Sequence, residues 1–66
     1  MKIKINGKEE AIDRIKSLAD LVSGKKLVPG HIVVEHNSRI VPKEEWLSVI
    51  VRENDALEIV SFVGGG

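Results

Sequence analysis

The residues with the most evident chemistry are three consecutive glycines, Gly64, Gly65 and Gly66, which follow an apolar stretch and stand last in the sequence. Glycine has no side chain to bury and loses the most conformational freedom on folding, so we expect these residues to project from the domain and to move. Because no Cβ obstructs such a tether, it can thread a narrow channel in a partner protein. A frayed end without function is the alternative. The position of the glycines, directly after the last predicted strand, favours the tether.

The carboxylate of Gly66 is the group that this tether would present. A terminal carboxylate is ionised at neutral pH and is then a poor acceptor for a nucleophile. Its conversion to an acyl-adenylate supplies a good leaving group and divides one difficult step into two easier ones. The sequence contains no cysteine, so the chain cannot carry a persulfide. Any sulfur that it carries must therefore sit on the terminal carbonyl.

The other polar residues do not form a predicted catalytic or metal site. His31 and His36 are five positions apart, which places them on opposite faces of a strand, and no third ligand is close in sequence. No acidic residue is placed to orient a histidine beside Ser38. A phosphate-binding loop of the G-x-x-x-x-G-K-[ST] type is absent. We therefore expect no enzyme activity, no metal and no bound cofactor, with the catalytic groups and the ATP site belonging to a partner.

The last predicted strand, residues 56–63, carries apolar residues that suggest a docking surface. Alternation places Leu57 and Ile59 on one face and Val60 and Phe62 on the other. If the first pair faces the helix, the second pair lies on the open side of the sheet and forms an exposed apolar patch. A local twist or bulge that buries Phe62 is the alternative. The predicted docking residues are Val33, Val60, Phe62 and Val63.

The composition indicates one small globular domain and argues against several classes of partner. Apolar residues make up 42% of the chain and charged residues 30%, which is ordinary for a folded protein. Lysine plus arginine number 10, as do aspartate plus glutamate, so no basic excess favours nucleic acid or a membrane surface. No apolar run approaches the roughly 20 residues of a membrane span. The N-terminus has no signal-peptide pattern, and we expect a cytoplasmic protein.

Alternation and turn signals predict the elements that position these residues. Residues 2–5 and 8–12 read as two strands joined by a hairpin at Asn6-Gly7. Ser17 and Asp20 resemble a capping box at the start of a helix over residues 17–23, whose apolar stripe is Leu18, Leu21 and Val22. Further strands are predicted over residues 31–36, 39–41 and 56–63. The order β-β-α-β-β-β predicts an α+β fold: a mixed sheet of four to five strands with one main helix on one face. The predicted domain is residues 1–63, followed by the tail 64–66.

Several segments together resemble one protein family. The hairpin Asn6-Gly7, the approach Asp55-Ala56-Leu57-Glu58-Ile59-Val60 and the ending Phe62-Val63-Gly64-Gly65-Gly66 are similar to those of the ThiS family, the sulfur carriers of thiamine (thiazole) biosynthesis. The resemblance runs along the whole chain. Two departures, Ser38 and Asn54, concern turns where the family often has glycine, and neither affects the tail.

This resemblance implies a ubiquitin-like β-grasp fold and a two-step activation of Gly66. A ThiF-type adenylyltransferase would join the Gly66 carboxylate to AMP from ATP. A sulfur donor, either a cysteine desulfurase or a persulfide protein, would then displace AMP and leave a thiocarboxylate. Thiazole synthase (ThiG-type) would accept the sulfur.

Three other functions fit the same pattern. A molybdopterin synthase small subunit also ends in Gly-Gly and delivers sulfur. A ubiquitin-like protein modifier would share the adenylation step but form isopeptide bonds to lysines. A β-grasp interaction module with an inert tail would work without Gly65 and Gly66. The fold by itself does not decide among these functions.

Overall fold

The computed structural model of the chain describes residues 1–62. Val63 and the predicted tail, residues 64–66, lie outside the described residues. The described chain forms a five-stranded main sheet, a two-stranded second sheet, one α-helix and two short 3₁₀ helices. In chain order the elements are β1 (Lys2–Ile5), β2 (Lys8–Ala11), β3 (Lys16–Ser17), α1 (Leu18–Gly24), η1 (Pro29–His31), β4 (Ile32–His36), β5 (Arg39–Val41), η2 (Lys43–Glu45), β6 (Ile50–Val51) and β7 (Ala56–Ser61).

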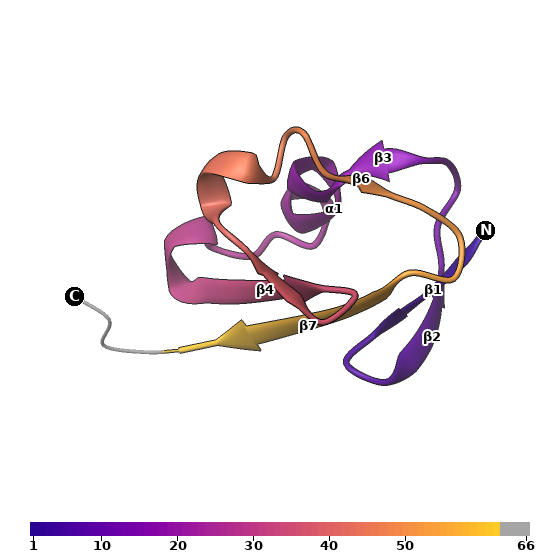
Figure 1. The fold of residues 1–66 in the computed structure, drawn as a ribbon, viewed down its shortest axis with the longest axis horizontal. Coiled ribbons are helices and arrows are strands. Elements are labelled where there is room, and N and C mark those ends of the chain that lie inside the picture. The colour runs from indigo at the N-terminus through magenta and orange to yellow at the C-terminus, as the bar shows by residue number, and fades with distance from the viewer. Residues whose placement is uncertain (63–66) are drawn as a thin grey trace.

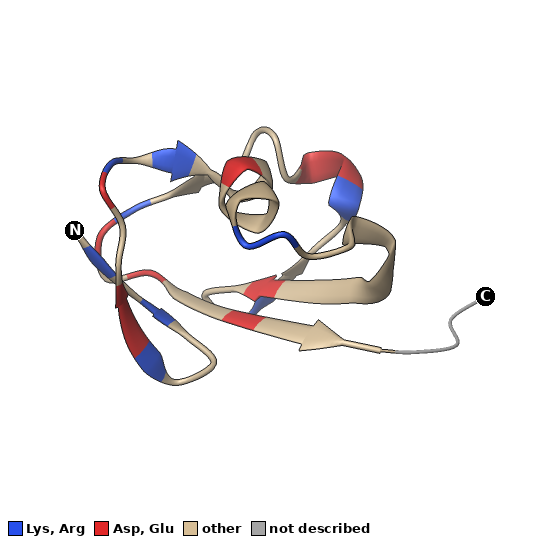
Figure 2. Cartoon of the chain, turned by 180° about the vertical axis from the view of Figure 1, so that it is seen from behind, with Lys and Arg blue, Asp and Glu red and all other residues tan. Residues whose placement is uncertain are grey.

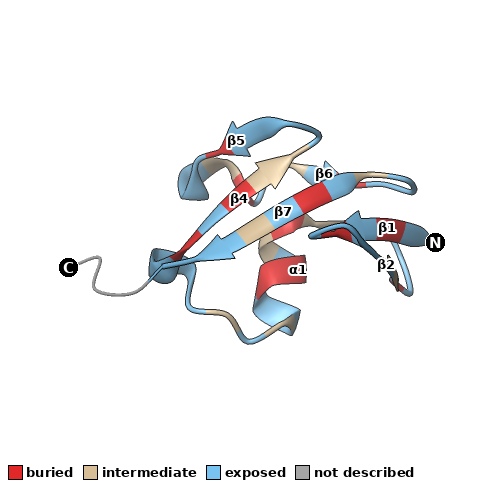
Figure 3. Cartoon of the chain, turned by 90° about the horizontal axis from the view of Figure 1, so that it is seen from below, coloured by how far each residue is buried: buried red, intermediate tan, exposed pale blue. Residues whose placement is uncertain are grey.

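The main sheet is mixed, because β1 and β7 run parallel whereas the other neighbouring strands are antiparallel. Its order is β2-β1-β7-β4-β5, so β7 lies in the centre, between β1 and β4. Helix α1 packs over one face of this sheet, and the opposite face is free of other elements in the described chain (Figures 1 and 3). This arrangement confirms the predicted α+β fold, with a mixed sheet and one main helix on one face.

Two tight turns set the strand register of the sheet. Asn6 and Gly7 have φ angles of 52° and 82°, the left-handed backbone that a two-residue hairpin turn of type I′ requires. Asn37 and Ser38, which join β4 to β5, have φ angles of 50° and 73°. Asn54 is also left-handed, with a φ of 71°. The two departures from the family pattern, Ser38 and Asn54, therefore do fall at turn positions that favour glycine.

Helix α1 begins at the predicted cap. The Ser17 hydroxyl accepts a hydrogen bond from the backbone N–H of Asp20 at 3.1 Å, which satisfies one of the free donors of the first turn. Leu18, Leu21 and Val22 are buried on the side that faces the sheet. The predicted cap at Ser17 and the predicted apolar stripe are thus confirmed, whereas the return hydrogen bond from the Asp20 side chain that a capping box requires is absent from residues 1–62.

The core lies between α1 and the main sheet and consists of apolar side chains from α1, from strands β1, β4, β5, β6 and β7, and from two loop positions. Trp46 is 5% exposed, and its indole N–H donates to the backbone carbonyl of Val41 at 3.0 Å. No buried side-chain nitrogen or oxygen within residues 1–62 lacks a hydrogen-bond partner. The helices of this part of the chain are all too short or too polar to cross a membrane. The buried core residues are Ile3, Ile5, Ile12, Leu18, Leu21, Val22, Ile32, Val34, Val41, Trp46, Val51 and Leu57.

The predicted elements differ from the structure in two ways: two short strands were not predicted, and two strands were predicted to be longer than they are. Strands β3 and β6 pair with each other in a second, two-stranded sheet, and neither was predicted, because two residues are too few to show alternation. Strand β2 ends at Ala11 and not at residue 12. Strand β7 ends at Ser61, short of the predicted residue 63. Phe62 nevertheless continues the ladder, since its N–H donates to the carbonyl of His31 at 2.9 Å.

Candidate functional site

The two faces of β7 are arranged as the alternation predicted. Leu57 is 1% exposed and belongs to the core, and Ile59 is half-buried and packs against the core. Val60 and Phe62 point to the open side and are 57% and 39% exposed. No bulge reverses the faces of the strand, so Phe62 is a surface residue. The strand thereby presents apolar side chains immediately before the predicted tail.

Val33 completes this surface from the neighbouring strand. It lies directly opposite Val60 in the antiparallel pairing of β4 with β7 and is 41% exposed. Ile40 on β5 is 62% exposed and also faces the open side, since its pairing partner Glu35 alternates with buried Val34. Sequence reasoning missed Ile40, although buried Val41 beside it implied an outward position. The sheet patch, meaning Val33, Ile40, Val60 and Phe62, lies on the face seen in Figure 3.

Asn6 fixes β7 close to its exit from the sheet. Its side-chain amide donates to the carbonyl of Ile59 at 3.1 Å and accepts from the N–H of Ile59 at 2.8 Å. These are the two hydrogen bonds that a further backbone residue of β1 would make to β7. The Asn6 amide therefore extends the parallel pairing of β1 with β7 past the end of β1. Sequence reasoning treated Asn6 only as a turn residue, because nothing local connects it with a partner 53 positions away.

Asp55 connects the loop before β7 with the turn after β4. His36 Nε2 lies 2.8 Å from one carboxylate oxygen of Asp55, and the amide of Asn37 donates to the other at 3.1 Å. The backbone N–H of Arg52 also donates to Asp55, at 2.8 Å. Partial burial raises the pKa of Asp55, but these hydrogen bonds outweigh burial and hold that pKa below its ordinary value. The prediction that no acid orients a histidine is thus wrong for His36.

The His36–Asp55 pair ties the turn after β4 to the loop before β7. In the described chain the Ser38 hydroxyl makes no hydrogen bond to His36, so the predicted absence of a serine–histidine pair holds for this part of the chain. Within residues 1–62, no three His, Cys, Asp or Glu side chains gather as ligands for a metal ion. The pair holds the start of β7 in place, and Asn37 adds a hydrogen bond from the N–H of Ala56 to its side-chain oxygen at 2.9 Å.

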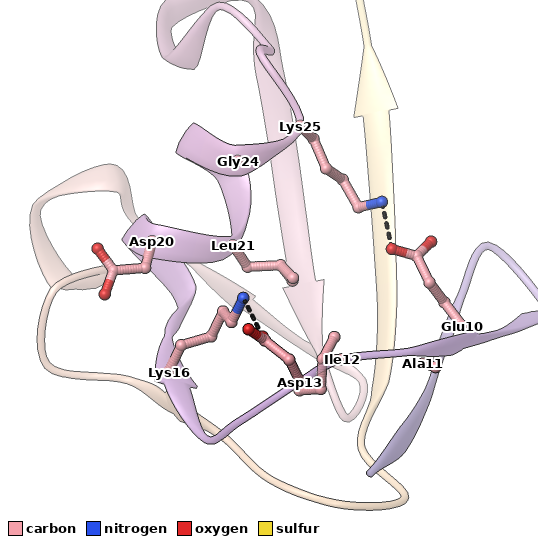
Figure 4. A pocket seen from close by; sticks show the side chains of 9 residues that line it. All are labelled: Glu10, Ala11, Ile12, Asp13, Lys16, Asp20, Leu21, Gly24 and Lys25. Carbon is pink, nitrogen blue, oxygen red and sulfur yellow. Dashed lines mark hydrogen bonds and ion pairs between the residues drawn. The ribbon is translucent and has the colours of Figure 1, made fainter.

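Two hollows mark the helix side of the molecule. One, of about 340 Å³, lies between β2 and α1, and both of its lysines are paired with carboxylates. Lys25 Nζ lies 2.6 Å from Glu10 Oε2, and Lys16 Nζ lies 3.2 Å from Asp13 Oδ1 (Figure 4). The other hollow, of about 460 Å³, is mostly apolar and is lined by Val22, Leu27, Trp46 and Leu47 among others.

The structure thus brings together only part of the predicted site. Val33, Val60 and Phe62 form one continuous surface with Ile40. Val63, Gly64, Gly65 and Gly66 lie outside the described residues, so their predicted positions and roles stay predictions.

Comparison with known proteins gives a consistent result. Residues 3–66 match the sequence profile of the ThiS family. The chain is 34% identical over 65 residues to the sulfur carrier protein ThiS of Bacillus subtilis, covering 97% of this chain and 98% of that protein. The crystal structure of a thiamine biosynthesis protein (ThiS) from Geobacter metallireducens superposes over the whole of both chains with a TM-score of 0.87 and 29% identity. This likeness confirms the predicted β-grasp fold.

Two further relatives are longer than the chain. The thiazole synthases of Paramagnetospirillum magneticum and Magnetococcus marinus are 38% and 33% identical to it over 66 residues. Each match covers the whole of this chain but only 20% of the relative. The chain therefore corresponds to about a fifth of each of these two proteins.

Proposed function

This chain belongs to the ThiS family, and on that premise we propose that it is a sulfur carrier protein for the biosynthesis of the thiazole part of thiamine. The observation that carries the proposal is the family match, which runs from residue 3 through the glycines to residue 66. In this role the chain is a carrier and a co-substrate of partner enzymes, not an enzyme itself. Its work belongs in the cytoplasm, where ATP is available.

The proposed chemistry takes place on the Gly66 carboxylate. One carboxylate oxygen attacks the α-phosphorus of ATP in a ThiF-type adenylyltransferase, and pyrophosphate leaves. A persulfide of the sulfur donor, a cysteine desulfurase or a persulfide protein, then attacks the acyl carbon and AMP leaves. A thiol cleaves the resulting acyl disulfide, so that the thiol side is oxidised to a disulfide and Gly66 keeps a thiocarboxylate.

The described residues contribute docking and geometry to these steps. Two residues of the sheet patch, Val60 in β7 and Phe62 directly after it, lead to the glycines, so a partner that holds this patch also receives the tail. Asn6 holds β7 at Ile59, and Asp55 holds the loop that precedes β7 against the turn after β4, through the hydrogen bonds described above. A defined exit point shortens the search of a tethered group for a partner's active site.

Thiazole synthase is the proposed acceptor of the sulfur. Two thiazole synthases each contain a region, about a fifth of their length, that is similar to this chain. This supports the partnership, because a region in the same chain as an enzyme is held near it at a high effective concentration. A molybdopterin synthase small subunit, a protein modifier and an inert interaction module remain the competing functions, and the family match favours the thiazole role over all three.

An intact-mass measurement tests the proposal. The protein is incubated with ATP, the ThiF-type adenylyltransferase and a cysteine desulfurase with cysteine. The expected product has one oxygen of the Gly66 carboxylate replaced by sulfur, and a variant without Gly66 stays unmodified. An unchanged mass in the presence of an active adenylyltransferase would favour the inert module, and adducts to lysines of other proteins would favour the modifier.

A further inference from the structure

Two glutamates lie side by side in the middle of the open sheet face. Glu35 on β4 and Glu58 on β7 are directly opposite each other in the antiparallel pairing. Both alternate with core residues, so both side chains point away from the helix. Figure 2 shows the two acidic positions on adjacent strands. Side chains in such a pair are about 5.5 Å apart at their base, and like charges at that spacing destabilise a sheet.

Neither glutamate has an ion-pair partner among residues 1–62. Each of the ion pairs within residues 1–62 uses other carboxylates, those of Glu9, Asp13, Glu10, Asp55 and Glu45. Two lysines of β1 face the same side: Lys2 pairs with Glu9, and Lys4 lies opposite Ala56 and makes no ion pair with either glutamate. Arg39, at the end of β5, is engaged with Glu45 at 2.8 Å.

The glutamates adjoin the sheet patch. Glu35 lies opposite Ile40, and the next outward-facing pair toward the tail is Val33 with Val60. The surface thus consists of apolar side chains beside two adjacent uncompensated carboxylates. A partner that covers the apolar part also removes water from the carboxylates. Because a charge interacts more strongly where water is excluded, these carboxylates favour a partner that brings a positive charge to them.

Building on the proposed function, we infer that this face binds the adenylating partner through a basic side chain, an arginine, seated between Glu35 and Glu58 and flanked by apolar contacts to the sheet patch. A guanidinium has donors on several edges and serves two carboxylates at once, which a compact ammonium does less well. Gly66 is eight residues beyond Glu58, a reach of at most about 28 Å. The face therefore lies within that distance of the partner's ATP site when Gly66 is adenylated.

The test compares binding with stability in Glu35→Gln, Glu58→Gln and the double variant. Binding to the ThiF-type adenylyltransferase is measured by titration calorimetry at several salt concentrations. We expect each single variant to raise Kd about tenfold, equivalent to about 1.4 kcal/mol, and the double variant to lose most of the salt dependence. The Tm of the free variants should stay unchanged or rise by about 1–4 °C, because a like-charge contact is relieved.

Glu44→Gln is the matched control, since Glu44 is an exposed carboxylate in η2, outside the main sheet. It changes the net charge equally and should leave Kd and its salt dependence unaltered. An equal loss of affinity in this control would show that overall charge acts and would overturn the inference. A Tm lowered by several degrees in Glu35→Gln or Glu58→Gln would also overturn it, because the carboxylates would then be structural.

The outcome for the wild-type protein separates this inference from the proposed function. If the wild type gains its thiocarboxylate and the double variant binds the adenylyltransferase equally well, the inference fails while the proposed function stands. If affinity is lost for thiazole synthase alone, the inference fails because the adenylating partner does not use this face. If the wild type is neither bound nor adenylated, the proposed function itself fails.

Discussion

Replacement of Asn6 by glycine should destabilise the protein although it preserves the turn. Glycine adopts the left-handed backbone of Asn6 without strain, so the substitution removes chiefly the two side-chain hydrogen bonds to Ile59. Each such bond contributes about 0.5–1.5 kcal/mol, and both are solvent-exposed here, which favours the lower part of that range. The expected loss is about 1–2 kcal/mol, or a fall in Tm of about 4–16 °C for a domain of this size.

Asn54→Gly is the control for the backbone effect. Asn54 has a φ of 71°, and within the described chain its side chain makes no hydrogen bond, whereas its N–H donates to the carbonyl of Lys2 at 2.8 Å. Glycine there should leave stability unchanged or raise it slightly. Asn6→Ala extends the series, because it loses the same bonds and, unlike glycine, keeps a Cβ at a positive φ without the short polar side chain that lets asparagine adopt this backbone, which costs about 1 kcal/mol more.

Urea unfolding followed by tryptophan fluorescence measures these differences, since Trp46 is buried in the core. The expected order of stability is Asn54→Gly at or above wild type, then Asn6→Gly, then Asn6→Ala. The reasoning is refuted if Asn6→Gly and Asn54→Gly unfold at the same urea concentration with equal slopes. The amide of Asn6 would then contribute nothing, and the parallel pairing of β1 with β7 would hold β7 without it.

Three further outcomes are expected. Phe62→Asp should weaken binding of the adenylyltransferase at least tenfold in titration calorimetry while Tm changes little, because Phe62 is 39% exposed; a fall in Tm of more than about 10 °C would show that Phe62 contributes to the core. Leu57→Ala should cost about 2–5 kcal/mol in urea unfolding, since Leu57 is 1% exposed; a loss below about 1 kcal/mol would mean that the core refills the space. The pKa of Asp55 is lowered from 3.8, so its contribution to stability is complete above that ordinary value and is lost as pH falls through the lower folded-state pKa. Asp55→Asn should therefore be less stable than wild type at neutral pH, with a gap that narrows on acidification, and a gap that stays constant with pH would contradict this assignment.

Local patterns predicted the parts of the fold that local forces determine. The alternation around Ile3 and Ile5, the Asn6-Gly7 turn and the cap at Ser17 each depend on residues within a few positions of one another, and all are confirmed. The face assignment of β7 is confirmed for the same reason, because one strand keeps its alternation unless a bulge intervenes.

Apart from outward-facing Ile40, which the neighbouring Val41 could have indicated, the unpredicted contacts depend on partners far away in the sequence. The side chain of Asn6 meets Ile59 across 53 positions, and His36 meets Asp55 across 19. No spacing rule indicates either pair, because the contact exists only after the strands have paired. The opposition of Glu35 and Glu58 depends on the register of β4 with β7, which the sequence alone leaves open.

The parallel pairing of β1 with β7 has a mechanical consequence. The start of β1 and the end of β7 lie at opposite ends of the molecule (Figure 1). A pulling force applied between them therefore slides the two strands lengthwise past each other, and the hydrogen bonds from Lys4 to Asp55, from Asn6 to Leu57 and from the Asn6 amide to Ile59 are loaded together. Several hydrogen bonds must then break at once, which slows unfolding under force. Because forced unfolding is governed by the unfolding rate, the domain should withstand a larger pulling force than its small size suggests. A lower rupture force for Asn6→Gly in single-molecule pulling would reveal the share carried by that one amide.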